Sequence, residues 1–454
     1  MQTTHSPRFP TLGLAILTVL AAGNAIAQPP AQVDELAALR SQIAALQQRL
    51  EKLESAPGGQ SANETTTLQV NRQGLVAKHK DNFTFRIRPR IQIDGRWFAD
   101  DEDGNSEFTV RRLRPIFQGT AGPVAWRFMP ELAGTVRMLD AWGDLSLGSH
   151  HYLRAGKFKQ PVGLERLQSF SKTLFLERGL PSLLTPTRDI GVALYGSDPA
   201  ERFNWTVGLF NGVLDDTDLS SNANLSGGDF DVGARLEFTP WKSATDSALA
   251  GLSFGLAASM GRENTSILDS ESDRRIRYRT SGRGTFFRYN DGVRVDGDRI
   301  RINPFLSYYH GPFGLLAEYV QSSYELTRSD NAQTIDTDAW TLQMGWVLTG
   351  EKASFSGVRP SRPFKWGSGQ IGAWELGLRA HALQVDDAAF AGDASTRLAR
   401  SNAVQEAFAW GIALNWYLTD NLLIATNFEI TDFSGLGLNR PTEEVVITRF
   451  QVDF

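Results

Sequence analysis

The chain has 454 residues, a formal net charge of −5 at pH 7 and no cysteine. The lack of cysteine excludes a disulfide framework, and the negative charge predicts no nucleic-acid partner. Arginine outnumbers lysine by 37 to 9, and arginine is the side chain that binds oxyanions through several hydrogen bonds at once. The choice of cation therefore points to anion recognition, although the net charge does not.

The N-terminus predicts a secretory signal peptide over residues 1–27. Arg8 precedes the apolar run Leu12–Ala22, and Ala25–Ala27 supplies the small residues of a cleavage position. That run is too short for a spanning helix, and no later segment reaches the roughly 18 apolar residues that one needs. We expect the chain to be exported. An uncleaved membrane anchor is the alternative.

Residues 28–56 are predicted to form a coiled-coil helix. Apolar side chains recur at alternating steps of three and four residues, which is a heptad seam: Leu36, Leu39, Ile43, Leu46, Leu50 and Leu53. The stretch Pro57–Gly59 ends the helix, and we interpret residues 57–82 as a polar linker. So narrow a seam needs partner helices, which predicts an oligomer. A lone amphipathic helix on the barrel or on lipid is the alternative.

From Phe83 onward the sequence predicts sixteen strands in which apolar and polar residues alternate. Their expected ranges are 83–98, 107–119, 124–134, 137–148, 151–159, 189–197, 202–212, 229–240, 249–261, 299–310, 313–325, 337–349, 371–383, 405–418, 421–432 and 444–454. Strands this long suit a tilted crossing of a bilayer. Long polar connections mostly follow odd strands and short turns follow even ones, apart from 350–370. The predicted fold class is all-β, a 16-stranded antiparallel transmembrane β-barrel over residues 83–454 with a water-filled lumen.

The stretch FRIRPRIQID, residues 85–94, has an arginine at every second position between apolar residues. An arginine that faces lipid at mid-bilayer costs about 2–4 kcal/mol. We therefore expect Arg86, Arg88 and Arg90 to face the lumen, where they would line the wall with positive charge.

Two local motifs are not expected to carry chemistry. The GxSxG stretch at 251–255 lies within an alternating strand, whereas a nucleophile elbow needs a strand, a sharp turn and a helix. His150 and His151 lie at a short turn, and no partner residue has the spacing of a metal site. We expect no catalytic residue, metal or cofactor. The classes that compete with a channel are an outer-membrane enzyme, an adhesion barrel with a plugged lumen, and a soluble secreted β-protein.

Six segments together resemble the phosphate-selective porin family of O and P type. They read GKFKQPVGLE (156–165), TPTRDIGVALYG (185–196), RINPFLSYYHGPFGLLAEYV (301–320), LTGE (348–351), GAWELGLRA (372–380) and NWYLTDN (415–421). The resemblance runs in order across the whole barrel. It implies a homotrimer of sixteen-stranded barrels in the Gram-negative outer membrane, whose third and fifth loops fold inward. Anions would pass along a ladder of arginines with a lysine at the constriction.

Thirteen cations are candidates for anion binding and pore lining. They are Arg86, Arg88, Arg90, Arg112, Arg114, Lys159, Arg166, Arg178, Arg274, Arg275, Arg277, Arg279 and Arg283. Lys159 and Arg166 flank the family-like PVGLE and are the constriction candidates, while the lysine equivalent to the family's pore lysine stays open.

Acidic residues near these cations have two possible effects. Glu165 and Glu177 lie in the loop that follows the fifth strand, and they either position the arginines or dilute the selectivity. Asp140, Asp144 and Glu375 are expected on the lumen face, where they would hold arginines in place.

The expected function is passive diffusion of anions, with phosphate, pyrophosphate or polyphosphate as the candidates. The other expected partners are outer-membrane lipid, further copies of the chain in a homotrimer, and the barrel-assembly machinery, which would read the C-terminal Phe454. The helix at 28–56 would lie in the periplasm. The alternative is a general porin with weak ion preference and no specific phosphate site.

Overall fold

The structure is a computed structural model that describes Ser41, Ala44, Ala45, Gln48 and residues 66–80, 82–100, 104–218, 230–268 and 276–454. The expected signal peptide and most of the expected coiled-coil helix lie outside these residues, and the four described positions at 41–48 are helical. The chain divides into two units at Glu64 and Thr65, and the second unit contains the barrel. In the described part of the chain, no helix is long and apolar enough to span a membrane.

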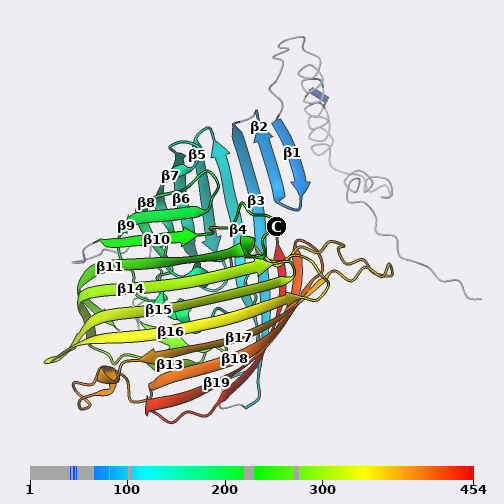
Figure 1. Ribbon diagram of the computed structural model, residues 1–454. Helices are drawn as coiled ribbons and strands as arrows, with labels where there is room; N and C mark the ends of the chain where they lie inside the picture. Colours follow the sequence, from blue (N-terminus) through cyan, green and yellow to red (C-terminus); the bar gives the residue numbers. More distant parts are fainter. Residues whose placement is uncertain are drawn as a thin grey trace, which may run out of the picture. The chain divides into compact units, whose positions relative to one another are not determined.

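Sixteen antiparallel strands close into a barrel, in which β20 (Glu443–Asp453) pairs with β3 (Phe83–Phe98) (Figure 1). The strands between them are β4 (Glu107–Ala121), β5 (Val124–Glu131), β6 (Arg137–Ser146), β7 (His151–Lys159), β8 (Arg188–Ser197), β9 (Phe203–Phe210), β10 (Asp231–Phe238), β11 (Leu252–Leu268), β14 (Val293–His310), β15 (Phe313–Arg328), β16 (Asn331–Val347), β17 (Ala373–Val385), β18 (Val404–Tyr417) and β19 (Leu422–Gly437). Each predicted strand overlaps one of these, so the predicted fold class of the barrel is confirmed.

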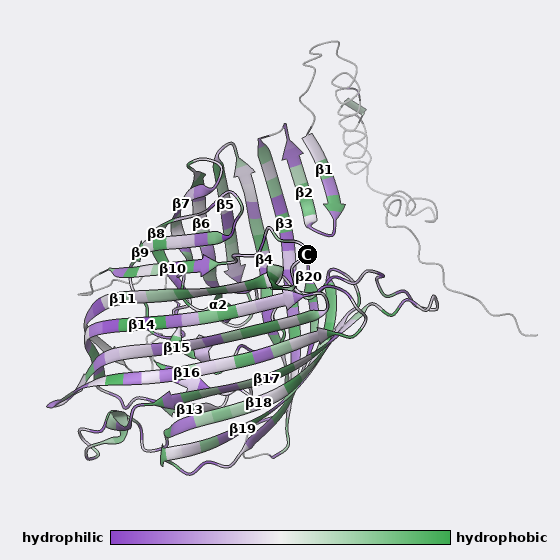
Figure 2. Ribbon diagram, viewed as in Figure 1, coloured by the Kyte–Doolittle hydropathy of each residue, from purple (hydrophilic) through white to green (hydrophobic). Residues whose placement is uncertain are grey.

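Side chains alternate between the outside of the barrel and its lumen. On β16, Trp340, Leu342 and Met344 are at least 40 % exposed, whereas Thr341 and Gln343 between them are buried. Hydrophobic and hydrophilic residues accordingly follow one another along the barrel strands (Figure 2). An apolar outer face opposite a polar inner one is the pattern that lipid outside and water inside require.

A β-hairpin precedes the barrel, so the interpretation of residues 57–82 as a linker is wrong for 66–79. The hairpin consists of β1 (Thr66–Asn71) and β2 (Gly74–His79), and β2 pairs with the first residues of β3, where β20 has already ended (Figure 1).

The hairpin turn explains why this segment folds back on itself. The side-chain oxygen of Asn71 accepts a hydrogen bond of 2.8 Å from the Gln73 N–H, an Asx-type turn. Gly74 follows with a φ of 89°, a backbone conformation that residues other than glycine rarely adopt. Arg72 in the same turn pairs with Asp420 at 3.1 Å, which ties the hairpin to the turn between β18 and β19.

Three connections fold into the barrel. The connection between β7 and β8, residues 160–187, is called here the inner loop; it contains α2 (Leu164–Leu167) and the 3-10 helix η1 (Leu180–Leu184). The connection between β11 and β14 contains β12 (Arg277–Arg279) and β13 (Thr285–Arg288). Aromatic residues of the latter, among them Phe286 and Phe287, pack in one buried cluster with η1. The third and fifth connections thus both fold inward in their described parts, as the resemblance implied.

The third inward segment comes from the rim that carries the short turns. Residues 348–372 form the long connection that broke the loop-length rule, and Ala353 and Val358 in it are buried. The backbone carbonyl of Phe355 accepts a hydrogen bond of 2.8 Å from Gln168 of the inner loop. The inner loop is therefore held from both ends of the barrel. Two further 3-10 helices lie in connections: η2 (Ala248–Gly251) and η3 (Asp387–Phe390).

Candidate anion pathway

Four of the thirteen candidate cations are paired with carboxylates of the protein. Arg90 pairs with Asp453 at 2.9 Å and Arg114 pairs with Glu131 at 2.7 Å. Arg166 and Arg279 share one carboxylate, that of Asp216, at 2.8 and 3.3 Å. Arg90 and Arg114 therefore present little net charge to a passing ion, whereas Arg166 and Arg279 keep one positive charge between them.

Six candidate cations have no carboxylate at ion-pair distance among the described residues. We call them the unpaired set: Arg86, Arg88, Arg112, Lys159, Arg178 and Arg283. Of the remaining three, Arg277 lies on β12, while Arg274 and Arg275 lie outside the described residues. Of the thirteen cations predicted from the sequence, these six are the ones for which the described part of the protein provides no carboxylate partner.

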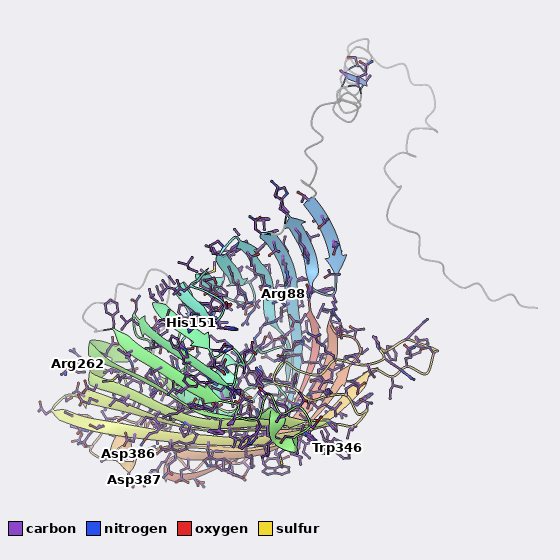
Figure 3. All side chains as sticks on the ribbon, turned by 45° about the horizontal axis from the view of Figure 1, so that its top comes forward. Arg88, His151, Arg262, Trp346, Asp386 and Asp387 are labelled. Atoms are coloured by element: carbon purple, nitrogen blue, oxygen red, sulfur yellow. The ribbon has the colours of Figure 1, made fainter. Side chains whose placement is uncertain are left out.

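Arg86 and Arg88 lie on the first half of β3, beside the paired Arg90 (Figure 3 labels Arg88). The Nε atoms of both are buried without a hydrogen-bond partner. The neighbouring Phe85 stacks on Trp126, with the ring centres 5.8 Å apart. Such an aromatic pair fits the outer side of the wall. Two adjacent arginines on one side of a strand repel each other unless an anion lies between them.

A β-bulge on β4 places a further arginine, Arg111, in the lumen. Gln92 lies opposite Arg112 and Ile93 lies opposite Val110, so Arg111 is the extra residue. Arg111 donates two hydrogen bonds, of 2.8 and 3.1 Å, to the carboxylate of Glu177 in the inner loop. Strict alternation selects only Arg112 and Arg114 on this strand, so the sequence interpretation missed Arg111.

Glu177 is a strong acid because of its neighbours. Burial acts to raise its pKa, but the charge and hydrogen bonds of Arg111, helped by Arg112 and Arg96, hold the pKa well below its usual value. Arg96 also binds Glu177 directly, at 3.0 Å. Of the two roles open to this glutamate, the structure favours positioning, because the carboxylate fixes two wall arginines against the loop.

The two constriction candidates are both engaged by the protein. The ammonium group of Lys159 donates to the backbone carbonyls of Arg166, Leu167 and Gln168 at 2.6, 3.2 and 3.2 Å, at the end of α2. Arg166 donates to Thr185 at 2.9 Å and to the carbonyl of Ser182, besides its pair with Asp216. Both side chains hold the inner loop in shape, and a direct role in the constriction stays a prediction.

Arg178 and Arg283 are the unpaired cations that belong to loops. Burial, followed by the positive charge of the neighbouring Arg166, lowers the pKa of the Arg178 guanidinium well below its ordinary value. Burial and the nearby Arg111 lower the pKa of Arg283 to about 10, so that it stays charged at neutral pH. Crowding of positive charge is the condition that favours an anion.

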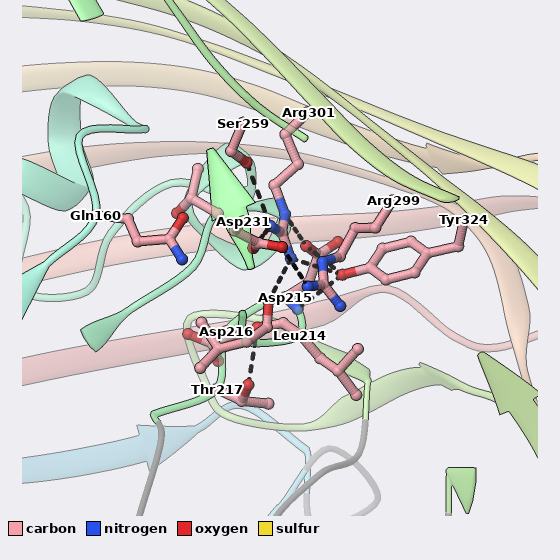
Figure 4. Close-up of polar contacts among 12 residues, drawn as sticks. Gln160, Leu214, Asp215, Asp216, Thr217, Asp231, Ser259, Arg299, Arg301 and Tyr324 are labelled. Carbon is pink, nitrogen blue, oxygen red and sulfur yellow. Dashed lines mark hydrogen bonds and ion pairs between the residues drawn. The ribbon is translucent and has the colours of Figure 1, made fainter. Parts of the chain in front are cut away.

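The connection that follows β9 acts as an acidic clamp on these loops. Asp215 accepts hydrogen bonds of 2.7 Å from Arg301 and 2.8 Å from the Tyr324 hydroxyl, within a buried network of the wall (Figure 4). The adjacent Asp216 then joins Arg166 of the inner loop to Arg279 of the fifth connection. No role was predicted for this acidic pair from the sequence; its signal there is the stretch DDTD at 215–218.

Two of the three expected lumen acids do hold arginines. Asp140 pairs with Arg188 and Asp144 pairs with Arg154, both at 2.7 Å. The expectation for Glu375 is wrong, because its carboxylate accepts hydrogen bonds from two neutral groups, the Tyr417 hydroxyl at 2.7 Å and the Asn415 amide at 3.3 Å.

The two local motifs occupy positions that fit structural roles. Ser253 of the GxSxG stretch lies on β11 and donates a hydrogen bond of 2.8 Å to Glu237, with the backbone in a strand rather than in an elbow. His151 starts β7 at the rim, and its ring lies 6.0 Å from that of Trp205 (Figure 3). In the described ranges, no group of three or more metal-binding side chains is found.

Replacing Asp216 with asparagine is expected to strengthen anion binding. The change removes the shared negative charge from Arg166 and Arg279, and one unit charge near the path changes binding by about 3- to 10-fold. The phosphate concentration that half-blocks the channel should fall by that factor in planar bilayers. Asp420→Asn is the matched control, because Asp420 pairs with the exposed Arg72 at the rim. An unchanged block in Asp216→Asn, or an equal change in the control, would contradict the neutralising role of Asp216.

Known structures share the barrel. OmpT, an outer-membrane protein of Vibrio cholerae in its trimer form, superposes with a TM-score of 0.53 at 9 % identity, covering 82 % of this chain and 100 % of that one. An anion-selective porin from Comamonas acidovorans superposes with a TM-score of 0.50 at 13 % identity, again over 82 % and 100 % of the two chains. At such identities the likeness supports the fold alone.

Two proteins are similar in sequence. An uncharacterised protein of Caulobacter vibrioides is 24 % identical over 491 residues, which cover 93 % of this chain and 91 % of that protein. Porin O of Pseudomonas aeruginosa is 25 % identical over 305 residues, which cover 61 % of this chain and 64 % of Porin O. The family model for phosphate-selective porins O and P matches residues 85–454, which is the barrel apart from the first two residues of β3. This chain therefore belongs to the phosphate-selective porin O and P family.

Proposed function

We propose that this chain forms an outer-membrane channel through which inorganic oxyanions diffuse passively, with phosphate, pyrophosphate and polyphosphate as the candidate solutes. The observation that carries the proposal is the unpaired set, six cations without a carboxylate partner among the described residues. Guanidinium N–H groups replace part of an oxyanion's hydration shell with charge-assisted hydrogen bonds of about 2.7–2.9 Å. Several weak sites in series let the ion enter and still leave, whereas one deep site would trap it.

The relatives support the same reading. Porin O carries the family's name, and the Comamonas protein is described as anion-selective. Membership of a porin family together with a closed barrel indicates a channel in the Gram-negative outer membrane rather than an enzyme. That no catalytic activity accompanies the channel is part of the proposal.

A general porin with weak ion preference is the second candidate. The observation that favours it is the number of candidate arginines bound to acids of the protein: Arg90 and Arg114 each have a carboxylate, and Arg166 and Arg279 share one. In that case the unpaired set would be too sparse to form a continuous path.

Phosphate block of chloride current distinguishes the two candidates. Single channels of the purified protein are recorded in planar bilayers in KCl, and phosphate is then added at rising concentration. The anion pathway predicts a chloride current that falls and saturates as phosphate occupies the path. A current that phosphate leaves unchanged would favour the general porin.

We also propose a homotrimer, stabilised by a coiled coil of the 28–56 helices in the periplasm. Deleting residues 28–60 should then lower the temperature at which the trimer dissociates in SDS gels, because the heptad seam would lose its partners. A matched deletion cannot be made in the barrel, because it would remove strands. The conductance of the shortened protein therefore serves as the control that the barrel still folds. Unchanged trimer dissociation would contradict the coiled coil.

The C-terminus fits a further partner of the proposal, the barrel-assembly machinery. Phe454 follows the last residue of β20, and its backbone N–H donates a hydrogen bond of 3.2 Å to the Pro89 carbonyl of β3, next to the seam where the barrel closes.

A further inference from the structure

Phe170 in the inner loop lies between two guanidinium groups. The Cζ of Arg112 is 3.6 Å from the centre of the Phe170 ring, and the Cζ of Arg178 is 3.5 Å from it. Two groups so close to one ring centre must occupy opposite faces, at the contact distance of stacked planes. Arg112 comes from β4 in the wall and Arg178 from the inner loop, so the ring joins the loop to the wall.

Phe170 differs from Phe175, the other phenylalanine of the inner loop with an arginine over its ring. Arg379 lies 4.2 Å from the centre of the Phe175 ring and also pairs with Glu429 at 2.5 Å. Both arginines on Phe170 belong to the unpaired set. An aromatic face attracts a cation through its quadrupole but carries no net charge. Phe170 can therefore hold two cations without neutralising them, which a carboxylate could not do.

The backbone around Phe170 is held by the loop and by the wall. The Lys172 N–H donates a hydrogen bond of 2.8 Å to the Ser169 carbonyl, which closes a turn around the phenylalanine. From β20, the side chain of Gln451 donates a hydrogen bond of 3.2 Å to the Ser171 carbonyl. These contacts hold the backbone on both sides of Phe170.

Each of the two guanidinium groups keeps one terminal nitrogen without a protein partner. Arg178 donates through Nε and Nη2 to the carbonyls of Glu165 and Gln168, at 2.8 and 2.7 Å. Arg112 donates through Nη1 to Gln92 at 2.7 Å. Within the described part of the protein, Nη1 of Arg178 and Nη2 of Arg112 have no hydrogen-bond acceptor.

Arg112 is only 1 % exposed, whereas Arg178 is half-buried. We infer that Phe170 is a positioning residue of the anion pathway, whose ring holds Arg178 of the loop against the buried Arg112 of the wall without neutralising either, so that Arg178 keeps an N–H edge for a passing oxyanion. The inference rests on the proposed function and names the residue that keeps this level of the path both ordered and positive. Removing the ring frees the two arginines to move toward acids of the protein, such as Glu177, whose charge already acts on Arg112.

The test replaces Phe170 with leucine and, separately, with tyrosine. Phe170→Leu keeps an apolar side chain but removes the aromatic face, so the phosphate concentration for half-block should rise by about 3- to 10-fold. Phe170→Tyr keeps the face and should stay within about twofold of the wild type. The chloride conductance and the trimer band in SDS gels report whether the channel is folded.

Phe175→Leu is the matched control, because it removes an aromatic face from an arginine that Glu429 already neutralises. It should leave the phosphate block unchanged. Any of three results overturns the inference. Phosphate half-blocks Phe170→Leu at the wild-type concentration, or the tyrosine variant needs as much phosphate for half-block as the leucine variant, or the Phe175→Leu control does. A wild type that phosphate does not block overturns the proposed function itself, and that result is separate from the comparison of variants.

Discussion

Replacing Arg112 and Arg178 together with glutamine is expected to raise the half-blocking phosphate concentration by about 100-fold. Each hydrogen bond from a charged donor contributes about 1.5–3 kcal/mol, and about 1.4 kcal/mol corresponds to tenfold in an equilibrium constant. The double variant removes the Arg178 donor and the positive charge of the buried Arg112 at the level of Phe170, where neither arginine has a carboxylate at ion-pair distance within the described chain. Titration of phosphate against single-channel chloride current measures the effect.

Two comparisons show whether this loss belongs to the site. Arg112→Lys with Arg178→Lys keeps the charge but loses the planar guanidinium group with its several donors. Its half-blocking phosphate concentration should therefore lie between those of the wild type and the glutamine variant. Arg72→Gln with Arg262→Gln removes two exposed arginines, each already paired with an aspartate, and should leave the block nearly unchanged. If that control loses phosphate block to the same degree, overall charge rather than the Phe170 level sets the affinity.

Replacing Arg301 with leucine is expected to lower the free energy of unfolding by about 3–5 kcal/mol, the usual result of removing one partner of a buried ion pair. Arg301 is 1 % exposed and donates to Asp215 at 2.7 Å, to the Tyr324 hydroxyl at 2.8 Å and to the Val213 carbonyl at 2.7 Å. Leucine leaves the carboxylate of Asp215 buried without its cation. The midpoint of urea unfolding in lipid vesicles, followed by tryptophan fluorescence, measures the loss.

The exposed pair at the hairpin turn supplies the comparison for stability. Arg72→Leu breaks an ion pair whose arginine side chain is 62 % exposed, so the expected loss is below about 1 kcal/mol. Adding Asp215→Asn to Arg301→Leu should recover part of the stability, because the uncompensated charge is then gone. Equal unfolding midpoints for Arg301→Leu and the wild type would show that the network in Figure 4 does not stabilise the wall.

The barrel could be predicted because each of its strands carries its own pattern. Lipid on one side and water on the other require alternation along the strand itself, so Trp340, Leu342 and Met344 mark β16 without knowledge of its neighbours. The hairpin β1–β2 was missed because its strands are only six residues long and the first of them is rich in threonine, asparagine and glutamine. Its signal was the alternation of Leu68 and Val70 before a turn that ends in glycine.

From the sequence, only the residue types of the candidate site and the side of the strand on which they lie could be predicted. Alternation places Arg86, Arg88 and Arg90 on the same side of the strand, but it does not show that, of the three, only Arg90 pairs with a carboxylate. Its partner Asp453 is 363 positions away in the sequence and becomes adjacent only when the barrel closes. Likewise, the bulge that brings Arg111 into the lumen is a feature of register between two strands, and no single strand reveals it.

The reversal potential of the wild-type channel under a tenfold KCl gradient tests the central claim most directly. If the unpaired set controls the path, the potential should lie close to the equilibrium potential of chloride, and it should move toward zero when Arg112 and Arg178 are replaced with glutamine. A wild-type potential near zero, or on the side of potassium, would contradict an anion pathway built on these cations.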